Sequence, residues 1–97
     1  MVIMIKRTLL AFAEKHPMSS IPLNSWYEVA RAADWNKLGD IKKDFNNVDY
    51  VGNDRYVFNI KGNSFRLVAM IFFDKRTLFI RFIGTHSEYD KINCSTI

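Results

Sequence analysis

The sequence predicts an α+β domain in which an N-terminal strand and a helical hairpin pack on one face of a mostly antiparallel sheet of four to five strands. Three observations lead to this prediction. The chain begins with a short β-prone run, continues with two stretches of helical periodicity, and changes at about residue 48 to β-rich runs. Gly, Asn and Asp residues separate these last runs, as in a meander of hairpins.

The N-terminal segment predicts one strand and one helix. The run VIMI, residues 2–5, is short, apolar and β-prone. A helix follows over roughly 8–15, because Leu9, Phe12 and Ala13 have the i, i+3, i+4 spacing of one helix face. The His-Pro pair after it ends this helix.

A second helix is predicted directly after this break, and the short loop makes the two helices an antiparallel hairpin. Ser19 or Ser20 is the expected N-cap, with Pro22 in the first turn. The residues expected on the apolar face of this helix are Leu23, Trp26, Tyr27, Ala30 and Ala33.

The middle of the chain changes from helix to strand. The connector DWNKLGDIKKDF is expected to hold one or two helical turns, with Asp40 as their cap and with Ile41 and Phe45 on one face. The predicted strands are VDYV at 48–51, RYVFNI at 55–60, SFRLVAMIFF at 64–73 and TLFIRFI at 77–83.

Alternation along these strands assigns their side chains to two faces of the sheet. The apolar sets are predicted to lie under the helices, and they comprise Tyr56, Phe58, Ile60, Phe65, Leu67, Ala69, Ile71, Leu78, Ile80 and Phe82. Strict alternation puts Ile83 on the opposite face. The polar members of that opposite face are Asn59, Lys61, Arg66 and Arg81. We therefore expect a concave, partly apolar face that carries several cations.

Length and composition indicate a single domain, 1–97, with one modest core and a loose tail of about the last five residues. The chain is 48% hydrophobic and 25% charged, which is typical of a globular protein and excludes a disordered one. No apolar run approaches membrane-spanning length and no signal peptide is recognisable, so we expect no membrane association. The single cysteine, Cys94, is expected to be a bystander in the tail and favours the cytoplasm.

The formal net charge of +4 favours an acidic partner such as nucleic acid or an acidic protein. Arg66 and Arg81 are the first candidates for a site, because they interrupt the most hydrophobic stretches and stand in phase on adjacent strands. Arginine binds phosphate through paired hydrogen bonds. The alternative is structural: each guanidinium reaches a sheet edge or pairs with Asp49 or Asp90.

A second candidate group follows the last strand in THSEYD. Thr85 and Glu88 have the spacing of a capping box, which places His86 at the first helical position. A helix N-terminus disfavours a positive imidazole, so we expect His86 to be neutral and able to accept a proton. Tyr89 and Asp90 lie three and four residues later, on the same face as His86. The alternative makes Tyr89 a lid on the core and Asp90 a solvated charge.

Three segments carry a resemblance to a known family: ADW at 33–35, RYVFNIKGNSFRLVAMI at 55–71 and IRFIGTHSEYDKI at 80–92. They resemble the HigB-type toxins of the RelE superfamily, the toxin halves of bacterial type II toxin–antitoxin modules. The resemblance implies the small α+β fold of that superfamily and a metal-independent endoribonuclease that cuts mRNA, usually on the ribosome. It also implies a tight complex with a cognate antitoxin, often a helix-turn-helix DNA-binding protein.

The resemblance assigns roles by position and requires no metal or other cofactor. The residues expected to be catalytic are Arg66, Arg81, His86 and Tyr89. The arginines would hold the scissile phosphate, the histidine would transfer a proton, and the tyrosine would orient the nucleotide or share the proton transfer. The residues expected to contact RNA are Lys61, Asn59 and Asn63, although Lys61 beside a Gly-Asn turn also fits a plain hairpin tip.

The main alternative function is a non-catalytic module that binds RNA or a partner protein through the same basic face. It predicts binding that weakens steeply with salt and yields no cleavage product. A second alternative is a toxin-like protein that has lost its activity and binds only its antitoxin.

Overall fold

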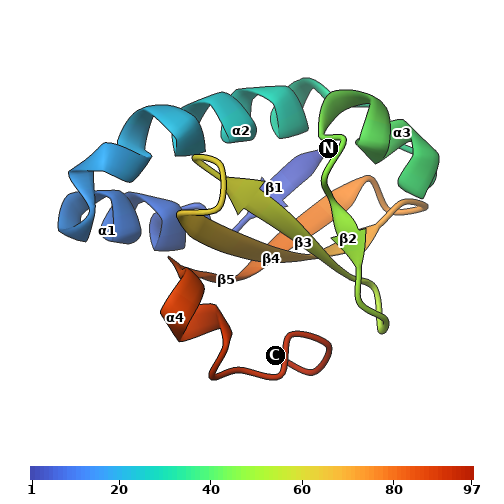
Figure 1. Cartoon of the computed structure of the whole chain (residues 1–97). Coiled ribbons are helices and arrows are strands. Elements are labelled where there is room, and N and C mark those ends of the chain that lie inside the picture. The colour runs from blue at the N-terminus through green and yellow to red at the C-terminus, as the bar shows by residue number, and fades with distance from the viewer.

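The computed structural model describes the whole chain, residues 1–97. Its elements confirm the predicted α+β class and follow the predicted order (Figure 1). The N-terminal half contains β1 (Val2–Met4), α1 (Arg7–Lys15), a 3-10 helix (Pro17–Ser19), α2 (Ser20–Ala32) and α3 (Leu38–Asp44). The C-terminal half contains β2 (Asp49–Tyr50), β3 (Arg55–Ile60), β4 (Phe65–Phe72), β5 (Thr77–Thr85) and α4 (His86–Tyr89).

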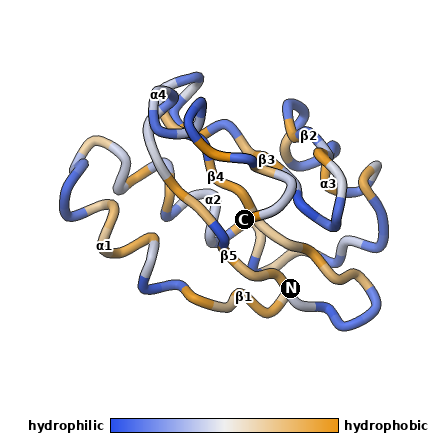
Figure 2. The backbone as a smooth tube through the Cα atoms, turned by 90° about the horizontal axis from the view of Figure 1, so that it is seen from below, coloured by the Kyte–Doolittle hydropathy of each residue, from blue (hydrophilic) through white to orange (hydrophobic).

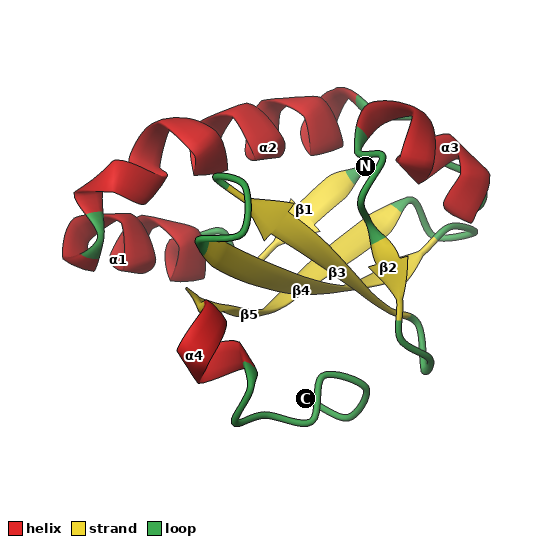
Figure 3. Cartoon of the chain, viewed as in Figure 1, coloured by secondary structure: helices red, strands yellow, loops and turns green.

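The five strands form one sheet in the order β1-β5-β4-β3-β2. β1 runs parallel to β5, and the other pairs are antiparallel. The helices α1, α2 and α3 cover one face of the sheet, whereas α4 and the C-terminal segment lie against the other (Figures 1 and 3). Hydrophobic residues concentrate along the strands, and hydrophilic ones occupy the turns and α4 (Figure 2).

The helical hairpin forms as predicted, but its serine cap does not. Ser19 occupies the N-cap position of α2 without a capping hydrogen bond. Its buried hydroxyl instead donates to the carbonyl oxygen of His16 at 2.7 Å, across the 3-10 turn. The cap predicted at Asp40 is also wrong, because α3 begins earlier and Asp40 lies in its first turn. The Asp40 carboxylate accepts from the backbone N–H of Asn36 at 2.9 Å and so closes the loop before the helix.

The centre of the core is an aromatic cluster between the helices and β3. Phe58 is 1% exposed, and its ring lies 5.3 Å from the rings of both Trp26 and Phe45, centroid to centroid. The Trp35 ring stacks on the same phenylalanine at 6.4 Å, and its indole N–H donates to Asp44 at 2.8 Å. This cluster fixes α2 and α3 on the sheet.

The segment Ala33 to Trp35 is bonded both to the N-terminus of the chain and to the turn between β4 and β5. The N-terminal ammonium of Met1 donates to the carbonyl of Ala33 at 2.9 Å. Arg76, in the turn between β4 and β5, donates to the carbonyl of Trp35 and forms an ion pair with Asp34. The motif ADW therefore connects the helical layer to the sheet.

The predicted alternation is wrong at the end of β5, where the strand contains a β-bulge. Ile80 pairs with Ala69 and Phe82 pairs with Val68, so Arg81 is an extra residue without an opposite partner. An extra residue reverses the faces of all side chains that follow it. Ile83 therefore packs against the core, and Phe82 lies on the opposite face.

The last residues contact the domain, whereas the sequence predicts a loose tail. The side-chain amide of Asn53 donates to the carbonyl of Ser95 at 2.9 Å. The Arg55 guanidinium donates to the carbonyl of Ile97, with its Nε at 2.9 Å. These bonds hold the C-terminal segment under β3, on the face opposite the helices.

The aromatic cluster leads to a stability prediction. Phe58→Ala removes a ring that is buried among three aromatic neighbours, so we expect it to lower the free energy of unfolding by about 3–5 kcal/mol. The matched control is Ile21→Ala on α2, where the side chain is 80% exposed and the change should stay within about 0.5 kcal/mol. Urea denaturation followed by circular dichroism measures both. A loss below about 1 kcal/mol at Phe58 would contradict the central position of this ring.

Candidate active site

Arg66 lies on β4, on the sheet face opposite the helices, as predicted. It is paired in register with Asn59 on β3, and its Nη1 donates to the Asn59 Oδ1. The two residues are half-buried. The carbonyl of the asparagine amide is neutral, so this bond fixes the guanidinium without cancelling its charge.

Neither Arg66 nor Arg81 forms an ion pair with an acidic side chain. The ion pairs of the chain join Arg31 to Glu28, Arg76 to Asp34 and His86 to Asp90. The part of the structural alternative in which these two arginines pair with Asp49 or Asp90 is therefore wrong. Arg66 keeps an uncompensated positive charge on a half-buried surface, which suits a phosphate.

Tyr89 connects α4 to this arginine. The Arg66 guanidinium carbon lies 5.6 Å from the centroid of the Tyr89 ring, within the range of a cation–π contact. Burial is the main cause that raises the pKa of the Tyr89 phenol to about 12, and a hydrogen bond with the Cys94 thiol adds to it. The nearby charge of Arg66 opposes this shift. The phenol is therefore protonated at neutral pH and carries a hydrogen that it can donate.

The β-bulge brings Phe82 and Gly84 to the same cluster. Gly84 is the register partner of Arg66, and the Phe82 ring lies 6.5 Å from the Tyr89 ring. A Cβ at Gly84 would stand 2.5 Å from Cζ of Phe82, so a larger residue here displaces the ring that packs beside Tyr89. No signal in IRFIG at 80–84 marks the bulge.

The capping box at the start of α4 is confirmed. The Thr85 hydroxyl accepts from the Glu88 backbone at 3.2 Å, and the Glu88 carboxylate accepts from the Thr85 backbone at 2.8 Å. The His86 Nδ1 lies 3.3 Å from the Asp90 carboxylate, so Asp90 can orient the imidazole. His86 is exposed and shares one turn of helix with Tyr89.

The remaining predicted residues lie away from the Arg66 contacts. Arg81 is exposed, and its side chain makes no hydrogen bond within the chain. Lys61 has a left-handed backbone, φ +54°, which ends the alternation of β3. Its ammonium lies 4.0 Å from the sulfur of Met18, toward the helices, and not on the Arg66 face as predicted. Asn63 is exposed in the same turn.

Cys94 lies near the Tyr89 phenol, a position that the sequence does not predict. It was expected to be a bystander, yet its thiol lies close enough to the Tyr89 phenol to contribute to the raised pKa of that group. No local pattern links these two side chains, since the contact depends on the path of the C-terminal segment under the sheet.

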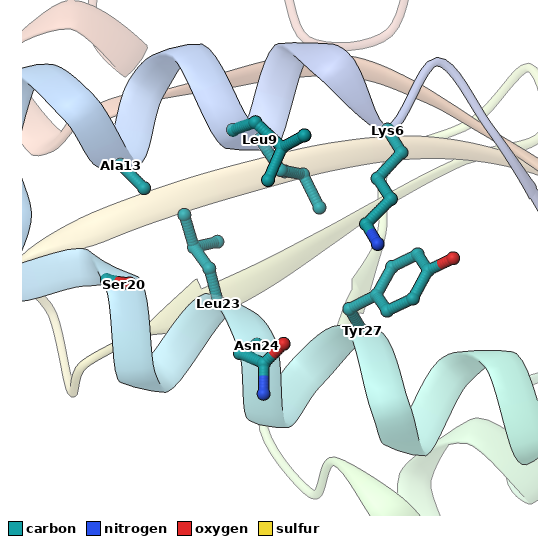
Figure 4. Close-up of a pocket in the computed structure, with 8 residues that line it drawn as sticks. Lys6, Leu9, Ala13, Ser20, Leu23, Asn24 and Tyr27 are labelled. Carbon is teal, nitrogen blue, oxygen red and sulfur yellow. The ribbon is translucent and has the colours of Figure 1, made fainter.

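The pocket between α1 and α2 lies on the other side of the sheet (Figure 4). It measures about 90 Å³, and its walls include Leu9, Leu23 and Tyr27. The Lys6 ammonium closes one end, 4.2 Å from the centroid of the Tyr27 ring. Its lining is mostly apolar and holds no acid or imidazole, so we place the chemistry at Arg66 instead.

Two further findings concern metals and membranes. The chain has no cluster of three or more His, Cys, Asp or Glu side chains that could hold a metal ion. None of its helices combines the length and the apolar character that crossing a membrane requires.

Comparison with known proteins gives one family. Residues 19–92 match the model of the HigB toxin family, described as the RelE-like toxic component of a toxin-antitoxin system. The mRNA interferase toxin HigB of Escherichia coli K12 is 33% identical over 93 residues, which cover 93% of this chain and 88% of that protein. The mRNA interferase HigB of Escherichia coli O6:H1 is 33% identical over 82 residues, which cover 82% of this chain and 80% of that protein.

The Tyr89 environment leads to a spectroscopic prediction. Because burial and Cys94 favour the protonated phenol, Tyr89 should ionise near pH 12 and the thiol should contribute to that shift. The difference in tyrosinate absorbance between the wild-type protein and Tyr89→Phe isolates this group. Cys94→Ala should lower its pKa. Ionisation of Tyr89 near pH 10, the value of a free tyrosine, would contradict the described contacts.

Proposed function

Because this chain belongs to the HigB toxin family, we propose that it is an mRNA endonuclease that uses the 2′-hydroxyl of the RNA as the nucleophile. The observation that carries the proposal is the cluster of Asn59, Arg66 and Tyr89. It combines a fixed, unneutralised guanidinium with a protonated phenol at the edge of α4. The names of the relatives, mRNA interferases, support the substrate class.

Cleavage requires two proton transfers and the stabilisation of one developing charge. A base takes the proton of the 2′-hydroxyl, the oxygen attacks phosphorus, and the bond from phosphorus to the 5′-oxygen breaks. An acid then protonates that leaving oxygen. The products are a 2′,3′-cyclic phosphate and a 5′-hydroxyl end.

Arg66 is assigned to the scissile phosphate, where its charge offsets the extra negative charge of the pentavalent transition state. The asparagine bond holds the guanidinium in place before the substrate arrives. Such preorganisation costs no reorganisation at the moment of reaction. Arg81, exposed on the bulge, is assigned to the same RNA backbone as a second cation.

His86 is assigned as the base, with Asp90 orienting its imidazole through the contact at Nδ1. Tyr89 is assigned as the donor to the leaving oxygen, since its raised pKa makes it a poor base at neutral pH. The same ring can orient a nucleotide by stacking. Lys61, Asn59 and Asn63 are assigned as further RNA contacts, with Lys61 and Asn63 at the outer end of the β3–β4 hairpin.

The proposal also covers the partner protein and the place of cleavage in the cell. A toxin of this family has an antitoxin partner, and we propose that this partner is a helix-turn-helix DNA-binding protein. We further propose that cleavage takes place in the cytoplasm, on mRNA that is being translated. A small neighbouring reading frame with a helix-turn-helix pattern would support the first point, and cuts confined to translated frames would support the second.

The role of Arg66 can be tested by expressing the chain alone and mapping new 5′ ends on cellular mRNA within minutes. Arg66→Ala should reduce the rate of cutting by about 100-fold or more, because it removes a preorganised charge. The control is Arg31→Ala on α2, an exposed arginine paired with Glu28, which should cut like the wild type. Wild-type cutting by the Arg66 variant would overturn its assignment. Absence of new ends from soluble, folded wild-type protein would favour the binding-module alternative.

The base can be tested in the same assay. His86→Ala should reduce cutting by about 10²- to 10⁴-fold, the usual contribution of a proton-transfer group. Asp90→Asn keeps the shape of the orienting residue and should cause a smaller loss. Cutting by the His86 variant at the wild-type rate would transfer the role of the base to another residue, and a full loss at Asp90 would show that orientation is decisive.

A further inference from the structure

A groove separate from the residues assigned to catalysis is lined by α1, by the end of β5 and by Glu88 of α4. It measures about 240 Å³ and opens between α1 and the end of β5. The residues of its lining that matter here are Phe12, Lys15, His16, Ile83 and Glu88. None of these residues has a role in the proposed reaction.

One wall of the groove is aromatic. The rings of Phe12 and His16 stack at 4.4 Å with an interplanar angle of 27°. Phe12 in turn packs edge-on against Phe65, at 5.3 Å between centroids. The imidazole is half-buried and held by this packing, and stacked aromatic surface of this kind is what unpaired RNA bases bind.

The polar part of the groove carries both signs of charge. Lys15 is an exposed cation on the last turn of α1. The backbone N–H of Thr85 is the main cause that lowers the pKa of the Glu88 carboxyl, and the charges of His16 and Lys91 lower it further. Glu88 is therefore ionised at neutral pH. Its Oε1 accepts from Thr85, whereas its Oε2 makes no hydrogen bond within the chain and can accept one.

The groove adjoins the Arg66 cluster through α4. Glu88 stands between His86 and Tyr89 in the same single turn. Its Oε1 would lie 3.1 Å from a Cβ at Gly84, which is the register partner of Arg66. Glu88 thus connects the two regions, because it lines the groove and belongs to the helical turn that carries His86 and Tyr89.

We propose that this groove binds one base beside the cleavage site and selects bases that carry an exocyclic amino group. The inference rests on the proposed ribonuclease function and adds its base preference. The base stacks on the half-buried imidazole of His16, which Phe12 supports from the core. Its amino group donates to Oε2 of Glu88, and Lys15 contacts the adjoining phosphate. Adenine, guanine and cytosine can donate through an exocyclic amino group. Uracil can donate only through its ring N3–H, where the two flanking carbonyl oxygens repel a carboxylate.

The test compares the base composition around the mapped cuts in cells expressing the wild type, Glu88→Gln or His16→Ala. Glutamine keeps the capping acceptor, since Gln also completes a capping box, but it removes the carboxylate charge. Uracil should be depleted at one fixed position beside the wild-type cuts and should return toward its background share in Glu88→Gln. The control is Glu14→Gln, an exposed glutamate on α1 outside the groove, which should keep the depletion.

The histidine variants test the stacking wall independently of Glu88. His16→Ala should slow cutting by about tenfold through the loss of stacking, and His16→Phe should restore most of the rate. Equal base composition at every position in the wild type and Glu88→Gln, with cutting intact, would overturn the groove inference alone. Loss of antitoxin binding in His16→Ala with unchanged base preference would also overturn it, in favour of a protein docking site. Absence of cuts from the wild type would overturn the ribonuclease proposal and this inference together.

Discussion

The arrangement of the sheet face opposite the helices depends on one extra residue in β5. Without the bulge at Arg81, Phe82 and Gly84 would face the helices, and Ile83 would stand beside Arg66. With it, the glycine lies opposite the arginine and leaves room for the phenylalanine ring. That ring packs against Tyr89 and sets the position of α4 beside β4.

Arg66 differs from the other arginines with side-chain partners because no carboxylate neutralises its charge. Arg31 and Arg76 bind carboxylates, which neutralise them and make them structural. Arg66 donates to the side-chain amide of Asn59 and makes a cation–π contact with the ring of Tyr89, and both partners are neutral. The fold thus holds the Arg66 guanidinium in place without a carboxylate partner, and this combination is what a metal-independent phosphate site requires.

Much of this fold follows from local patterns in the sequence. The helical periodicity and the Gly, Asn and Asp turns predict the order of the elements, and the spacing of Thr85 and Glu88 predicts the capping box. The bulge is not predictable in this way, because every residue of IRFI is equally compatible with a regular strand. The contact between Arg55 and Ile97 is also invisible to local analysis, since 42 residues separate them in sequence. The influence of Cys94 on Tyr89 is not predictable either, because it depends on the path of the C-terminal segment under the sheet.

The chemistry of the new RNA ends tests the central claim most directly, because the 2′-hydroxyl mechanism leaves a 5′-hydroxyl and a 2′,3′-cyclic phosphate. RNA from cells that express this chain alone would be ligated to an adaptor with and without prior phosphorylation of its 5′ ends. The account predicts new ends in mRNA that become ligatable only after phosphorylation. New ends that already carry a 5′-phosphate would contradict it, because water and not the RNA's own hydroxyl would then be the nucleophile.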